Sequence, residues 1–160
     1  MNNFEAYKMD GLGNDFVIFD QRRNPISLSK EKIIEISNRN NVGCDQVILI
    51  DKDKSNNLFL KFFNSDGSEI AACGNGSRCV AYLLMKEEKK EKITLKTKAG
   101  TLKAELSGKN FVSLNIGEPN FLWSKIPLIK EMDNKNLQIK INNIHGKEFV
   151  GGFSLNVGNP

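Results

Sequence analysis

The stretch ACGNGSRCVAYLLMKEE, residues 72–88, decides the fold of this chain. From Cys79 to Met85 its residues are apolar on every face of a helix, and charged residues begin only at Lys86. A helix without a polar face is normally a buried one. Because the rest of the chain is rich in short strands, we expect an α+β domain in which a sheet curls around this central helix.

Strand-like segments lie on both sides of this helix and end at turn residues. Before it, the expected strands are 4–9, 16–20, 47–50 and 58–63, the first two joined by a glycine turn over 10–14. After it, they are 92–98, 101–106, 110–116, 136–141, 139–144 and 148–156. One further helix is predicted from the N-cap Ser29 to about Asn38, with an apolar face of Ile33, Ile34 and Ile36.

A break in the strand series follows residue 116. Gly117, Glu118 and Pro119 interrupt the pattern, and no clear period follows them. We therefore expect one domain over residues 1–117 and the start of a second over 118–160. About forty residues rarely bury a core unaided, so the second domain is expected to be incomplete.

The composition is that of a globular protein. Of the 160 residues, 39% are hydrophobic and 26% are charged, which excludes a disordered, collagen-like or coiled-coil chain. No apolar run approaches the roughly 20 residues of a membrane-spanning helix, and no secretory signal is visible at the N-terminus. We therefore expect a cytoplasmic protein without membrane association.

Charge and cysteine usage exclude further classes of protein. The net charge is +4, but the densest charged run, residues 86–92, mixes lysines and glutamates. This mixture is typical of a solvated helix end, so no nucleic-acid partner is expected. The three cysteines are Cys44, Cys73 and Cys79, an odd number that argues against a disulfide framework. The single His145 has no partner at zinc-site spacing, so no structural metal is expected.

Cys73 is the strongest candidate for chemistry, since it lies where a turn meets the start of the buried helix. The positive end of the helix dipole should lower the pKa of its thiol from the free value of about 8.5. The free N–H groups of Gly74, Asn75 and Gly76 can bind a carboxylate or phosphate. A thiolate beside an anion site suits proton abstraction or nucleophilic attack. Alternatively, Cys73 is a small buried apolar residue, and for Cys79 within the helix that packing role is preferred.

Two common catalytic arrangements are not supported. His145 falls in a polar turn, where a surface position is expected, so no Cys–His nucleophile is indicated. Gly11-Leu12-Gly13 has no third glycine at the dinucleotide-binding spacing, and no Gly-Lys-Ser/Thr follows any glycine stretch.

Four ordered motifs together resemble the diaminopimelate epimerase family. They are MDGLGNDF at 9–16, GCDQ at 43–46, FNSDGS at 63–68 and CGNGSRC at 73–79. GNP at 158–160 resembles the start of a fifth family motif. The resemblance covers the whole chain but only the first part of a typical member. It implies a mixed, mostly antiparallel sheet curled around the central helix, with a second, similar domain only partly present.

The resemblance also implies a function. Members of the family convert LL-diaminopimelate to the meso form for lysine and peptidoglycan precursor synthesis, with two cysteines as bases and no cofactor or metal. Cys73 matches the first of these bases. The substrate-binding residues carried over are Asn14, Gln46, Asn64, Gly74, Asn75 and Asn159. Removal of the α-proton places negative charge on the substrate carboxylate, which amides at a helix start can stabilise in the transition state.

Parts of the family's machinery lie beyond residue 160. These are the second cysteine, a Glu-Arg pair, a further asparagine and a strand that returns to the first domain. Inversion of a stereocentre by two bases needs a group on each face of the α-carbon, and this chain supplies one. We therefore expect no turnover from this chain alone. For the complete protein we expect a homodimer.

Two other hypotheses remain open. The first is a related isomerase that acts on another amino acid, of the proline racemase or phenazine type. The second is a non-catalytic remnant or fragment that keeps the fold without its partner half. Asp15, Asp45 and Arg78 also match the motifs, and we interpret them as structural residues of the turns and the helix start.

Overall fold

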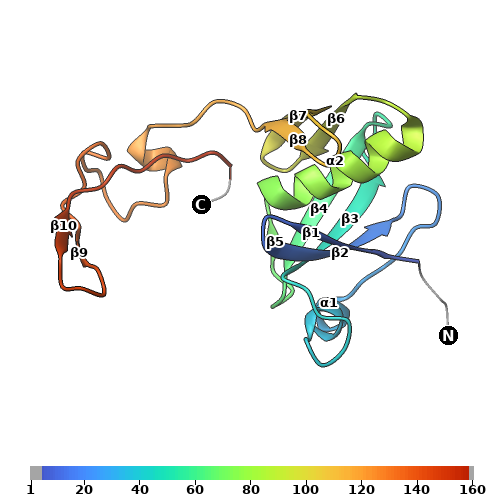
Figure 1. Ribbon diagram of the computed structural model, residues 1–160, viewed down its shortest axis with the longest axis horizontal. Helices are drawn as coiled ribbons and strands as arrows, with labels where there is room; N and C mark the ends of the chain where they lie inside the picture. Colours follow the sequence, from blue (N-terminus) through green and yellow to red (C-terminus); the bar gives the residue numbers. More distant parts are fainter. Residues whose placement is uncertain (1–4, 159–160) are drawn as a thin grey trace. The chain divides into compact units, whose positions relative to one another are not determined.

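The computed structural model describes residues 5–158, which form two compact units (Figure 1). The first unit ends at Ile116 and the second begins at Gly117. Within the described residues, no helix is both long and apolar enough to cross a membrane.

The first unit consists of one curled sheet and two helices. Its strands are β1 (Tyr7–Gly11), β2 (Asn14–Asp20), β3 (Gln46–Lys52), β4 (Leu58–Asn64), β5 (Glu69–Ile70), β6 (Lys92–Thr97), β7 (Gly100–Leu106) and β8 (Val112–Asn115). Its helices are α1 (Lys30–Ser37) and α2 (Gly74–Glu88). The strand order is β1-β2-β3-β4-β6-β7-β8, with β5 paired to β4. The pairs β2/β3 and β4/β6 are parallel and the other pairs antiparallel, which confirms the predicted mixed sheet.

Helix α2 forms the centre of this unit, as its apolar sequence predicts. Val80, Ala81 and Leu84 are fully buried in a core that includes residues of β2, β3, β4, β6 and β7. Partly buried side chains from both edge strands, Met9 of β1 and Leu114 of β8, pack against the same core. The sheet therefore curls around α2, and the two edge strands come to the same helix from opposite ends of the strand order (Figure 1).

Helix α1 covers the opposite face of the sheet (Figure 1). Successive residues of a strand point to opposite faces, so Val17 and Val47 pack with Ile33 of α1 while their neighbours face α2. The Ser29 hydroxyl accepts the Lys32 N–H at 3.3 Å, which confirms the predicted N-cap. The prediction for Ile34 is wrong: its side chain is 43% exposed because that face of α1 points away from the sheet.

The first hairpin differs from its prediction in turn length. Strand β1 continues to Gly11 and β2 begins at Asn14, so only Leu12 and Gly13 form the turn. Both residues have positive φ, 57° and 87°. A two-residue hairpin turn favours this conformation, because the twist of the turn then matches that of the strands. Asn14 is consequently the first residue of a strand and not part of a loop.

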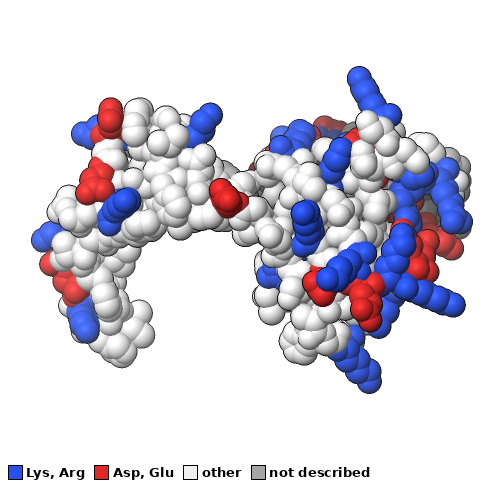
Figure 2. All heavy atoms as spheres, turned by 90° about the horizontal axis from the view of Figure 1, so that it is seen from above, with Lys and Arg blue, Asp and Glu red and all other residues white. Residues whose placement is uncertain are grey.

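The charged run over residues 86–92 begins in the last turn of α2, so it is a helix end, as predicted. The helix ends at Glu88, and Lys89 forms its C-cap in the left-handed conformation, with φ 53°. On the face shown in Figure 2, acidic side chains lie between the basic ones, so the positive charge is spread over the surface.

The second unit contains little regular structure. It has a 3-10 helix, η1 (Trp123–Lys125), and one hairpin of β9 (Lys140–Asn142) and β10 (Glu148–Val150). The predicted strand over 136–141 is largely wrong, because the Ile139 N–H donates to the Leu137 carbonyl in a three-residue turn. The strand predicted over 148–156 stops at Val150, because Gly151 has a φ of 97°.

We expect Gly76→Ala to destabilise the first unit by about 1–2 kcal/mol, measured by urea unfolding. A methyl group at Gly76 would lie 2.7 Å from Ile48 Cδ1 and 3.3 Å from ring atoms of Phe16 and Phe62, all fully buried. Gly74→Ala is the matched control, since its methyl would meet only the Arg78 guanidinium at 3.6 Å. An equal free energy of unfolding for the two variants would contradict the predicted overpacking.

Candidate active site

Three polar residues lie at one end of the sheet because of strand register. Asn14 is the first residue of β2 and Gln46 the first of β3, and these strands are parallel, with Phe16 opposite Gln46. Asn64 ends the antiparallel strand β4 directly opposite Gln46. The start of α2 packs there too, since Gly76 lies against Phe16. The sheet therefore brings three of the predicted amides to the start of α2.

Cys73 is the N-cap residue of α2. Its Sγ accepts the Gly76 N–H at 3.4 Å, and the side chain is 9% exposed. Burial raises the pKa of the Cys73 thiol, while the N–H groups of Gly76 and Asn75 and the charge of Arg78 lower it. Burial outweighs the other influences, so the predicted lowering of the pKa is wrong. The resting Cys73 is a protonated thiol held by the first turn of the helix.

The predicted amides are joined in two pairs. Gln46 Nε2 donates to Asn64 Oδ1 at 3.0 Å, and Asn64 Nδ2 donates to Ser68 Oγ at 3.2 Å. Gln46 Oε1 is buried, and no described residue donates a hydrogen bond to it. In the second pair, Asn75 Nδ2 donates to Asn14 Oδ1 at 2.8 Å and so joins α2 to the first hairpin.

Charged residues surround the Asn14 side of the site. Arg39 binds Asp15 through both terminal nitrogens, at 2.6 and 2.8 Å, and binds Asp45 at 2.7 Å. Lys8 pairs with Asp15 at 2.7 Å and also contacts the Gly43 carbonyl. The Arg39 guanidinium, with Lys8 and the Asp45 N–H, holds the pKa of Asp15 well below its ordinary value.

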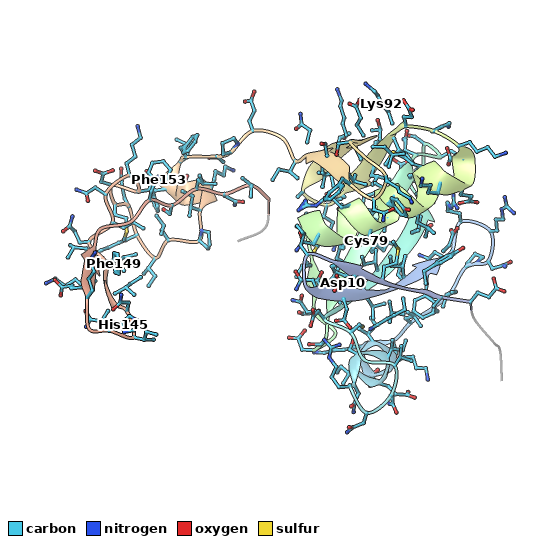
Figure 3. The ribbon with its side chains drawn as sticks, viewed as in Figure 1. Asp10, Cys79, Lys92, His145, Phe149 and Phe153 are labelled. Carbon is cyan, nitrogen blue, oxygen red and sulfur yellow. The ribbon has the colours of Figure 1, made fainter. Side chains whose placement is uncertain are left out.

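The other two cysteines occupy apolar surroundings. Cys79 is 5% exposed, and a methyl group on Gly11 of β1 would lie 2.8 Å from its Sγ. Figure 3 shows Cys79 on α2 beside β1, the strand that carries Asp10. Burial, with smaller contributions from Asp10 and Cys73, raises the pKa of Cys79 to about 11. Cys44 is buried in the core between the sheet and α1.

The structure thus places Cys73, Gly74 and Asn75 at the start of α2, next to Asn14, while Asn159 lies outside the described residues. Arg78 donates to Asn75 Oδ1 at 2.9 Å and to the Gly74 carbonyl at 3.5 Å, a contact that suits its predicted structural role. His145 is exposed in a turn, as expected. Among residues 5–158, no cluster of three or more His, Cys, Asp or Glu side chains could hold a metal ion.

None of the sequence motifs includes Arg39, so its contacts at this site were not expected from the sequence. One signal was available, because only four of the 23 basic residues are arginines: Arg22, Arg23, Arg39 and Arg78. In a chain this rich in lysine, an arginine can indicate a position that needs the planar, forked donors of a guanidinium, which a lysine ammonium does not provide.

Comparisons with known proteins identify relatives of this chain. The sequence model of the diaminopimelate epimerase family matches residues 6–122. The chain is 51% identical to the diaminopimelate epimerase of Pelagibacter ubique, covering 99% of this chain and 58% of that protein. It is 38% identical to that of a Caulobacter species, covering 96% and 56%. A predicted epimerase from Pseudomonas aeruginosa matches 74% of this chain and 45% of its own, with a TM-score of 0.56 and 17% identity.

The fold is therefore one that epimerases adopt. The chain belongs to the diaminopimelate epimerase family. It spans 56–58% of the length of the two curated relatives named above.

We expect an alkylating agent to label Cys73 faster than Cys79 at neutral pH. Both thiols are buried, but Cys73 receives amide donors that stabilise its thiolate, whereas Asp10 opposes ionisation of Cys79. Trypsin cleaves after Arg78, so the two cysteines fall in separate peptides whose labelling is followed by mass spectrometry. Equal rates would count against the assigned position of Cys73 at the helix start.

Asp15→Asn should cost about 1 kcal/mol of stability at pH 7, because Arg39 and Lys8 lose an anionic partner. The folded-state pKa of Asp15 is below the ordinary 3.8, so its stabilisation is complete above about pH 4 and is lost as the pH falls further. The difference between the urea midpoints of the wild type and the variant should therefore narrow as the pH falls from 4 to 2. A difference that stays constant over this range would contradict the ion-pair origin.

Proposed function

We propose that this chain provides the first half of a cofactor-independent epimerase that converts LL-diaminopimelate to meso-diaminopimelate. Membership of the family supports this proposal, and the observation that carries it is the position of Cys73. The thiol caps an enclosed helix two residues before Asn75, which in turn contacts Asn14. On this proposal residues 1–117 form the domain with the first base, and 118–160 begin a second domain.

The proposed reaction exchanges one proton on each face of the α-carbon. In one direction the Cys73 thiolate removes the α-proton, and a second base on the opposite face delivers a proton to the planar carbanion. In the other direction the Cys73 thiol donates its proton. Residues outside 1–160 would supply the second base, so this chain contributes one face of the site. The reaction needs no oxidant, because each C–H bond broken is replaced by another.

The helix start has the groups that such a carbanion requires. Negative charge develops on the substrate carboxylate as the α-proton leaves, and N–H groups preoriented toward that charge stabilise the transition state more than the ground state. Gly74 and Asn75 lie in the first turn of α2, where backbone N–H groups have no partner within the helix. We assign the substrate carboxylate to these two residues.

The amides Asn14, Gln46 and Asn64 would bind the remaining polar groups of the substrate. Each offers both a donor and an acceptor, which suits a molecule that carries ammonium and carboxylate groups at both ends. The free Gln46 Oε1 can accept from an ammonium once the side chain turns toward the site. Asn159 is proposed as a further substrate ligand, and the complete protein as a cytoplasmic homodimer.

The test is exchange of the diaminopimelate α-proton in deuterated water, catalysed by the intact gene product. We expect Cys73→Ser to lower the exchange rate at least about 100-fold, since general acid–base groups contribute about 10²–10⁴-fold. Cys79→Ser is the control and should keep most of the activity, since Cys79 packs against Gly11.

Two results would overturn the proposal. An intact mass of 17.9 kDa without exchange would indicate a non-catalytic remnant of the fold. Exchange on proline or another amino acid, but not on diaminopimelate, would indicate a related isomerase.

A further inference from the structure

We propose that Arg39 is a positioning residue, which sets the orientation of the Asn14 amide at the substrate site by way of Asp45. The inference rests on the proposed function, because Asn14 is a substrate ligand only there. Its structural part concerns hydrogen bonds that can be observed without substrate.

Arg39 lies in the segment between α1 and β3 and joins two carboxylates. It binds both oxygens of Asp15 and one oxygen of Asp45, at 2.6–2.8 Å. Asp15 belongs to β2 and Asp45 immediately precedes β3, so one guanidinium holds the beginnings of two parallel strands together. A planar fork of donors can make these three contacts at once, whereas a lysine ammonium is a point charge.

The two carboxylates also hold each other's backbone. Asp45 Oδ2 accepts the Asp15 N–H at 3.1 Å, and Asp15 Oδ1 accepts the Asp45 N–H at 2.9 Å. Two negative charges this close repel each other unless a cation lies between them. Arg39 neutralises that repulsion and fixes which oxygen of Asp45 faces Asn14.

That oxygen determines how the Asn14 amide is turned. Asn14 Nδ2 donates to Asp45 Oδ2 at 3.3 Å, and Asn14 Oδ1 accepts from Asn75 Nδ2 at 2.8 Å. Arg78 then donates to Asn75 Oδ1 at 2.9 Å. At one end of this row of hydrogen bonds the Asp45 carboxylate can only accept, and at the other end the Arg78 guanidinium can only donate. Both amides between them therefore have one orientation that satisfies every contact.

The contacts of Arg39 affect the orientation of the Asn14 amide more than the stability of the fold. The Arg39 side chain is 60% exposed, and ion pairs of such exposed groups contribute little to folding. Asn14 is itself exposed, so without Asp45 only the contact with Asn75 would orient its amide. If the Asn14 side chain became ordered only when substrate bound, the cost of ordering it would lower the affinity for substrate. Fixing the side chain beforehand avoids this cost.

The test compares Arg39→Lys with Arg22→Lys in the intact gene product. Arg22 makes a similar two-pronged contact with Asp20 and binds Glu87 near the end of α2, away from the start of that helix. Side-chain amide resonances of Asn14 and Asn75 are recorded without substrate, and α-proton exchange of diaminopimelate gives KM and kcat. Urea midpoints report stability.

For Arg39→Lys we expect shifted Asn14 and Asn75 amide resonances and a KM raised about 10-fold, with a smaller change in kcat. Arg22→Lys should leave the resonances and KM unchanged, even where its urea midpoint falls further. Unchanged resonances in Arg39→Lys would overturn the inference, as would a KM equal to that of the wild type. Shifted resonances in a protein without exchange activity would support the structural link and refute the proposed function.

Discussion

The close approach of α2 to the sheet determines the rest of the first unit. Gly76 leaves room for the buried Phe16, Ile48 and Phe62, and Gly11 of β1 leaves room for Cys79, three residues further along α2. A side chain at either position would overlap these neighbours and force the helix or the strands to shift. The contact between the first turn of α2 and Asn14 depends on this close packing, as does the position of Cys73 beside the strand ends that carry the amides.

The same packing explains the acid–base character of Cys73. Enclosing the helix start disfavours the thiolate, and the helix amides favour it, with burial prevailing in the resting protein. The inversion that we propose requires each base to donate a proton in one direction and to remove one in the other. A thiol of very low pKa would hold its proton too weakly to donate it and would be a weak base for a carbon acid. The balance at Cys73 therefore suits both roles.

Local sequence patterns predicted the individual helices and strands better than they predicted which strands pair and which side chains meet. The unbroken apolar run of Val80–Met85 indicated a buried helix, and alternation along Leu58–Phe63 indicated a strand, because both patterns report the immediate chain. The parallel pairing of β2 with β3 joins residues 30 positions apart, and no local pattern encodes it. The Cys73 pKa likewise depends on burial by distant strands. The amides could be proposed from motifs, but the contact between Asn14 and Asn75 spans 61 positions.

The distribution of arginine follows from what its fork can do. Most ion pairs here are lysine pairs that join single atoms, such as Lys61 with Asp51 and Lys96 with Asp53. Arg39 and Arg22 instead each hold acidic partners from separate segments. Arg39 joins Asp15 to Asp45 at the strand starts, and Arg22 joins Asp20 to Glu87 and Glu88 at the end of α2. A lysine could replace either charge without reproducing the angle between the two contacts. In this lysine-rich chain, Arg39 and Arg22 therefore mark places whose geometry, and not only their charge, is constrained.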